Sequence, residues 1–137
     1  MATFRHTALK DNTLHFRLLE VYSGEGCELR AKLIEYEVTR AVPYEAVSYA
    51  WGAEPDGSFN VDEEPYIRIG DFYHRITWSL RKAIEVFRFS NRSRTLWIDQ
   101  ICINQSKTEE GKLEKDGQLP LMGKIYQNAK QTLIWLG

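Results

Sequence analysis

Cysteines and long apolar runs are both scarce in this chain. Cys27 and Cys102 are the only cysteines among 137 residues, too few for a disulfide framework or a cysteine-based zinc site. No apolar stretch approaches the roughly 20 residues of a membrane-spanning helix. The first residues also lack the apolar segment of a secretory signal. We therefore expect a cytoplasmic protein with no metal site and no membrane segment.

A strong charge of either sign is missing as well. The formal net charge is -1, which gives no electrostatic reason to expect nucleic acid or an anionic membrane as a partner. Neither the dinucleotide-binding G-x-G-x-x-G pattern nor a Walker phosphate loop occurs. Hydrophobic residues make up 43% and charged residues 27%, a composition typical of globular proteins. The length allows one domain.

Three apolar runs have the character of buried strands. Residues 44–50 close at Trp51 and a glycine, residues 95–98 end at Asp99, and residues 132–136 follow later. Helical spacing of apolar residues predicts a helix over residues 78–89, and Pro120 fits the first turn of a second helix. Strand, helix, strand, helix, strand predicts a parallel α/β sheet, with the first of these strands between the other two.

Two antiparallel hairpins are also expected. Residues 14–18 alternate between apolar and polar side chains and continue as a strand to residue 22, and after a turn at 23–26 the chain can return as a strand over 28–38. Residues 66–76 form a second hairpin on a Gly70-Asp71 turn. The first hairpin precedes the parallel unit and adds to it.

Five residues are candidates for ligand binding, because polar groups at the carboxyl ends of parallel strands commonly bind ligands. Asp99 ends the second core strand, and could either serve a site or cap a turn. Ser48 and Trp51 could hold a ribose or an aromatic ring of a ligand. We prefer the interpretation that Ser48 is a small core residue and that the Trp51 ring fills space in the core. The amides of Asn104 and Gln105 could orient a ligand or satisfy loop backbone. No catalytic residue is identified.

Other polar residues are expected to be structural. Glu45 begins its strand at the opposite end and is expected to face solvent or pair with an arginine. Glu114 and Gln118 are four residues apart, and we expect them in a solvated first turn of a helix that Gly117 weakens. Cys102 lies between two isoleucines and is expected to be an inert buried thiol, since none of the three histidines belongs to a recognisable dyad motif.

Four motifs together carry a family resemblance. They are residues 44–52 (YEAVSYAWG), 96–105 (LWIDQICINQ), 121–129 (LMGKIYQNA) and 132–137 (TLIWLG). In this order they resemble the heterokaryon incompatibility domain of filamentous fungi, from about Phe16 to the last residue. The resemblance implies a fungal non-self recognition module that triggers cell death.

The same resemblance implies a remote similarity to Toll/interleukin-1 receptor domains. The expected fold is therefore α/β, with a flavodoxin-like parallel core of three strands and crossover helices, plus the N-terminal antiparallel hairpin. Some of those receptor domains hydrolyse NAD with a glutamate that follows the third strand. This sequence stops at Gly137, so we expect residues 1–137 to be a single domain that is incomplete at its C-terminus and does not hydrolyse NAD alone.

Two hypotheses about function follow. The first, which we favour, is an interaction module whose partners are other protein domains, including copies of itself. The alternative is an NAD-hydrolase-like domain with NAD as substrate, no bound cofactor, and Ser48, Trp51 and Asp99 near the ligand. A closed cavity at the carboxyl edge would favour the hydrolase, whereas a shallow edge with an exposed apolar patch would favour the interaction module.

Overall fold

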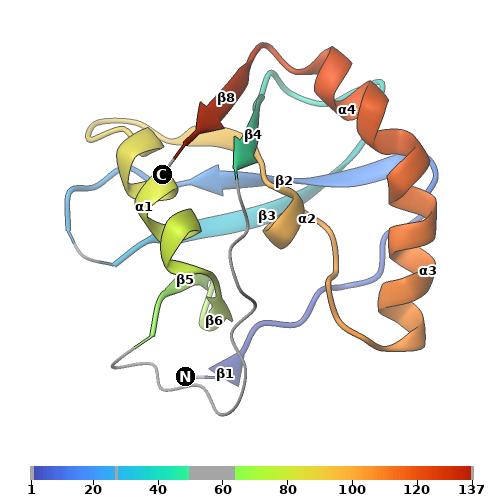
Figure 1. The fold of residues 1–137 in the computed structure, drawn as a ribbon, viewed down its shortest axis with the longest axis horizontal. Coiled ribbons are helices and arrows are strands. Elements are labelled where there is room, and N and C mark those ends of the chain that lie inside the picture. The colour runs from blue at the N-terminus through green and yellow to red at the C-terminus, as the bar shows by residue number, and fades with distance from the viewer. Residues whose placement is uncertain (1, 27, 50–63, 137) are drawn as a thin grey trace.

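The computed structural model describes residues 2–26, 28–49 and 64–136, which form one mixed eight-stranded sheet flanked by helices (Figure 1). The order across the sheet is β1-β6-β5-β3-β2-β7-β4-β8. The strands are β1 (Ala2–Thr3), β2 (His15–Val21), β3 (Arg30–Glu37), β4 (Glu45–Tyr49), β5 (Tyr66–Ile69), β6 (Phe72–Arg75), β7 (Arg94–Trp97) and β8 (Thr132–Trp135).

The predicted parallel unit is confirmed. β4 lies between β7 and β8 and runs parallel to both, with Ala46 opposite Trp97 on one side and Thr132 on the other. β4 buries Ala46 and Val47, as expected for a strand covered on both faces.

The N-terminal hairpin is also confirmed, but its place in the fold differs from the expectation. β2 and β3 pair antiparallel along their whole length, and β2 then pairs antiparallel with β7. The hairpin is therefore part of the same sheet as the parallel strands, and the sheet is mixed. Phe16, Leu18 and Leu19 of β2 are fully buried, because this strand lies in the middle of the sheet.

The second hairpin turns on Gly70, as predicted. Its φ of 62° lies in the left-handed region that glycine adopts without a steric penalty. Beyond this hairpin, the short β1 pairs in parallel with β6 and ends the sheet on that side. The N-terminal segment is thereby tied to a strand 70 residues further along the chain, since Thr3 Oγ1 also donates to the Tyr73 hydroxyl.

The first long helix, α1 (Trp78–Phe87), begins where the sequence predicted. Thr77 is its N-cap, and its side chain accepts a hydrogen bond of 3.2 Å from the Leu80 N–H. Leu80, Ala83 and Ile84 form its buried stripe. The helix ends at Phe87, two residues before the predicted end.

Helices α1 and α4 (Met122–Asn128) pack against opposite faces of the parallel strands. The Trp135 ring contacts Phe87 of α1, while the Trp97 ring contacts Tyr126 of α4, each edge to face. Trp97 shares a face with Ala46 and Thr132, and Trp135 lies on the other face because side chains alternate along a strand. The layered α/β arrangement follows from these contacts.

The polar, charged and glycine-containing sequence of residues 106–117 predicts a loop with a short helical turn around residues 109–113, and the structure corrects this expectation. The segment forms α3 (Glu109–Gln118), capped by Thr108, and passes through the 3-10 turn η1 (Leu119–Leu121), which contains Pro120, directly into α4 (Figure 1). The two glycines of α3 lie where the helix touches its neighbours. A Cβ on Gly111 would collide with the Ser106 carbonyl, and one on Gly117 with the Asn12 side chain.

Candidate functional site

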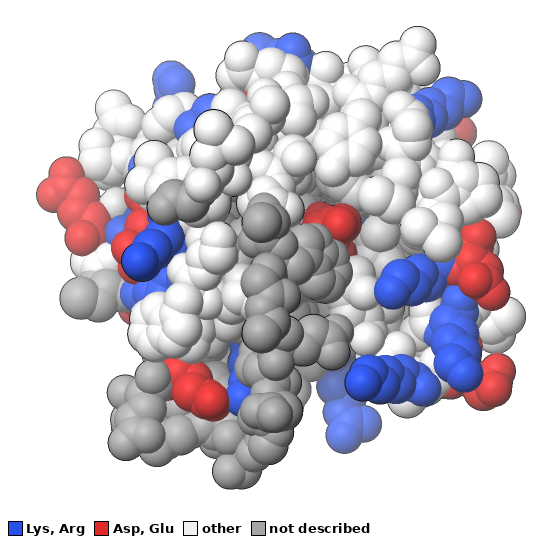
Figure 2. Space-filling model, in the orientation of Figure 1, with Lys and Arg blue, Asp and Glu red and all other residues white. Residues whose placement is uncertain are grey.

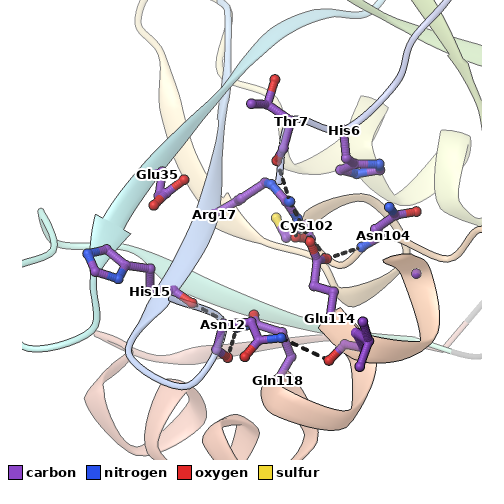
Figure 3. A network of polar contacts seen from close by, with 12 residues as sticks. His6, Thr7, Asn12, His15, Arg17, Glu35, Cys102, Asn104, Glu114 and Gln118 are labelled. Carbon is purple, nitrogen blue, oxygen red and sulfur yellow. Dashed lines mark hydrogen bonds and ion pairs between the residues drawn. The ribbon is translucent and has the colours of Figure 1, made fainter. Parts of the chain in front are cut away.

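A buried ion pair joins β2 to α3 (Figure 3). The guanidinium of Arg17 donates to both carboxylate oxygens of Glu114, at 2.6 and 2.9 Å. Arg17 and Glu114 are only 4% and 6% exposed, respectively. A buried bidentate pair of this kind fixes the position of both elements, because either charge alone would be costly in the interior.

Backbone groups complete the coordination of this pair. Arg17 also donates to the carbonyl oxygens of Cys102 and Thr7, and the backbone N–H of Asn104 donates to Glu114. Burial alone would raise the pKa of Glu114, but the bonds from Arg17 and Asn104 lower it below its usual value. The network thus connects the N-terminal segment, β2, the segment after α2 (Asp99–Cys102) and α3.

One turn further along α3, Gln118 makes a second buried link. Its amide nitrogen donates to the carbonyl oxygens of Asn12 and His15, at 2.8 and 2.7 Å. Asn12 in turn donates to the Leu113 carbonyl. The expectation that Glu114 and Gln118 lie in a solvated turn is therefore wrong: both face the protein interior, and their shared helix face was the signal that could have revealed it.

Asp99 lies at the carboxyl edge of the sheet, as its position after β7 predicted. It is the first residue of α2 and is half-buried. The hydroxyl of Tyr49, at the end of β4, donates to the side chain of Gln100 at 3.2 Å. Burial is the largest cause that raises the pKa values of Tyr49 and Tyr126, and the negative charge of Asp99 is the second. Asp99 and two tyrosines from β4 and α4 therefore lie near one another at this edge.

Ser48 and Trp51 have different outcomes. Ser48 is exposed on β4 and lies opposite Ile134 of β8, so it is not the small core residue of the reading we preferred. Trp51 lies outside the described residues. A site shared by Asp99 with Ser48 or Trp51 stays a prediction.

Asn104 and Gln105 satisfy backbone groups after α2. The side-chain oxygen of Asn104 accepts from the Ser106 N–H, and the amide nitrogen of Gln105 donates to the Asp99 carbonyl. Both also line a hollow of about 500 Å³ beside His6 and His74. A ligand-orienting role for the two amides stays a prediction.

His6 and His74 form a pair that the sequence could not indicate, since they are 68 positions apart. Their rings lie edge to face with centroids 5.7 Å apart, and Phe4 packs against both. His6 donates through Nε2 to the Ile101 carbonyl, and His74 donates through Nδ1 to the Arg75 carbonyl. Burial lowers the pKa of both, for His74 to about 4, where the neighbouring His6 adds to the effect.

Two structural expectations are confirmed. Glu45 accepts two bonds from the Arg94 guanidinium, at 2.7 and 2.8 Å, and this pairing lowers its pKa. Cys102 is fully buried, and burial raises the pKa of its thiol to about 12, so it is not a thiolate nucleophile at neutral pH.

Among the residues that the structure describes, no three His, Cys, Asp or Glu side chains are grouped as a metal site, and no helix is long and apolar enough to span a membrane.

Comparison with known proteins agrees with the four motifs. Residues 44–137, which include β4, β7, α4 and β8, match the model of the heterokaryon incompatibility protein family. The chain belongs to the heterokaryon incompatibility family. This heterokaryon incompatibility domain is also 31% identical, over 145 aligned positions, to heterokaryon incompatibility protein 6, OR allele, of Neurospora crassa.

The alignment with that relative covers 98% of this chain but 20% of the relative. The chain thus spans about a fifth of the length of the Neurospora protein. No solved structure significantly matches this heterokaryon incompatibility domain. Its similarity to Toll/interleukin-1 receptor domains accordingly stays a prediction.

Proposed function

We propose that this chain is the module through which a fungal incompatibility protein associates with like domains and so signals cell death in non-self recognition. Membership of the heterokaryon incompatibility family supports the biological setting. The proposed mode of action rests on the surface around β8.

β8 is the last strand of the sheet, and β4 is its one strand neighbour among the described residues. It contains no charged residue. Ile134 is 65% exposed and Leu136, just after the strand, is 94% exposed. Figure 2 shows mainly uncharged side chains over the upper part of this face, where β8 and α4 lie in Figure 1. An apolar strand with unpaired backbone groups is suited to pairing with another strand.

The two hypotheses differ in the surface that they require, because a hydrolase needs a cavity that surrounds its substrate. The exposed apolar strand β8 supports the interaction module, which we keep as the proposed function.

The test is the oligomeric state of the chain over a range of concentrations, measured by sedimentation velocity. We expect concentration-dependent association that Ile134→Lys abolishes, because a lysine there would bring a charge into the contact. Val86→Lys is the matched control, since Val86 is 63% exposed but lies on α1. A chain that stays monomeric at high concentration, or that both lysine variants affect equally, would refute the proposal.

The NAD-hydrolase alternative has one observation in its favour, the grouping of Asp99 and Tyr49 at the carboxyl edge. Its measurement is nicotinamide release from NAD by the purified chain. Turnover that survives repurification and disappears in Asp99→Asn would establish the alternative in place of the interaction module.

A further inference from the structure

A basic surface at the amino end of the parallel strands has no part in the function proposed above. Two adjoining hollows, of about 640 and 430 Å³, share Pro43, Tyr44 and Lys130 in their linings. They lie where β4 begins, at the opposite end of that strand from Tyr49 and Asp99. Both volumes are in the range of small-molecule sites. We refer to the two together as the basic hollow.

Positive charge dominates the described lining of the basic hollow. Lys124, Lys130, Arg92 and Arg94 line it together with a single carboxylate, Glu45. The bidentate bond to Arg94 neutralises that carboxylate, and Gln131 also donates to it. Among the described residues, the other three cations make no ion pair. Three positively charged side chains that make no ion pair with the described residues thus gather on a chain whose net charge is -1.

Neighbouring groups hold several of these cations in place. The guanidinium of Arg92 lies 4.4 Å from the centre of the Phe89 ring, and that of Arg94 lies at the same distance from it. The backbone N–H of Lys130 donates to the Tyr44 carbonyl at 2.8 Å, which fixes this residue at the junction of the two hollows. The nearby charge of Lys130 is also one of the influences that keep Glu45 ionised.

We propose that the basic hollow binds a ligand carrying more than one phosphate group, with Lys130 between two of the groups. Guanidinium and ammonium groups are the preferred protein partners of phosphate. Side-chain donors of Ser93 and Asn128 also line the two hollows. In Figure 2, Lys and Arg side chains are seen at separate points of the upper rim, one group of them above the start of β8 in Figure 1.

A compact polyanion suits this surface better than an acidic polypeptide. The cations gather in two adjoining hollows and do not form a long stripe, so one small ligand can reach both hollows through their shared residue. A purely structural role for the lysines is the competing account, because α4 ends at Asn128 and cations stabilise a helix C-terminus. The two accounts differ in whether removal of a lysine charge alters binding or only stability.

Isothermal titration calorimetry of the full chain, with inorganic tripolyphosphate as the probe, tests the proposal. We expect saturable binding at least about tenfold tighter than that of inorganic phosphate at equal ionic strength. Lys130→Gln should weaken tripolyphosphate binding by about tenfold, as expected for the loss of a charge-assisted contact. Lys112→Gln, an exposed α3 lysine outside the basic hollow, is the matched control and should change the affinity by less than about twofold.

Chemical denaturation of the same variants checks that each remains folded. Absence of saturable binding, or equal losses in the two variants, would overturn the proposal, and so would a Lys130→Gln effect confined to stability. Tighter binding of polyglutamate than of tripolyphosphate would overturn it in favour of an acidic polypeptide.

Two further titrations identify the source of the phosphate. Free inositol hexakisphosphate represents a soluble ligand, and phosphatidylcholine vesicles with phosphatidylinositol bisphosphate represent a lipid headgroup. Binding of either that Lys130→Gln weakens and Lys112→Gln spares supports the proposal and assigns the source. If neither inositol hexakisphosphate nor the vesicles bind, the proposal is contradicted, as it is if the native chain shows no saturable binding of tripolyphosphate.

Discussion

The buried pair of Arg17 and Glu114 allows a sharp test by replacing Glu114 with glutamine. Glutamine keeps the shape of the side chain and opens no cavity, but it removes the negative charge and places an N–H donor where a carboxylate oxygen accepted a hydrogen bond. Arg17, 4% exposed, would then remain buried without a counter-ion. Removing one partner of a buried ion pair typically destabilises a protein by about 3–5 kcal/mol. Domains of this size have a free energy of unfolding of about 5–15 kcal/mol, so the loss should be a large fraction of the total.

Urea denaturation at pH 7 measures this loss. Glu109→Gln is the control, since Glu109 is an exposed glutamate in the first turn of the same helix, and its replacement should cost less than about 1 kcal/mol. The pKa of Glu114 is lower in the folded state than its unfolded value of 4.5. The carboxylate therefore contributes its full stabilisation above the unfolded pKa, and this stabilisation is lost as the pH falls through the folded pKa. The difference between the native chain and Glu114→Gln should therefore narrow only below about pH 4.5. Equal losses in Glu114→Gln and Glu109→Gln at pH 7 would refute the reasoning.

Two further predictions concern pH and helix packing. Because the pKa of His74 falls from 6.5 to about 4 on folding, its contribution to stability is present above pH 6.5 and is lost as the pH falls towards 4. Urea midpoints across this range should show that His74→Asn removes part of this loss, and a pH profile identical to that of the native chain would contradict the prediction. In thermal melts, Gly123→Ala should raise the free energy of unfolding by about 0.5–1 kcal/mol, because the added methyl group meets nothing within 4 Å. Gly111→Ala should lower the free energy of unfolding, because the added methyl group would meet the Ser106 carbonyl. A stabilising Gly111→Ala would show that this close approach relaxes freely.

The parallel strands could be predicted from the sequence because their information is local. β4 and β7 are short apolar runs that end in recognisable polar groups, and the capping residue Thr77 directly precedes the apolar stripe of α1. Each of these signals lies within a few residues of the structure it specifies. The order β7-β4-β8 then followed from general rules for crossovers between parallel strands.

The helix α3 and the buried polar network could not be predicted in the same way. α3 has almost no apolar stripe, and its buried side includes Gly111, Glu114 and Gln118. Glu114 and Gln118 find partners in the N-terminal segment and β2, about 100 residues away, so hydrophobic periodicity gives no sign of their burial. For the same reason, the proximity of His6 to His74 becomes visible only once β1 is paired with β6.

The length of chain between Arg17 and Glu114 has a consequence for folding during synthesis. The two partners are 97 positions apart in the sequence. At about 5–20 residues per second, the ribosome adds Glu114 roughly 5–20 s after Arg17. Throughout that interval the central strand β2 carries a guanidinium with no carboxylate to receive it, and the arginine must stay hydrated. We therefore expect the packing around Arg17 to be completed only after α3 has left the exit tunnel, so that the last third of the chain sets the time at which β2 becomes fully native.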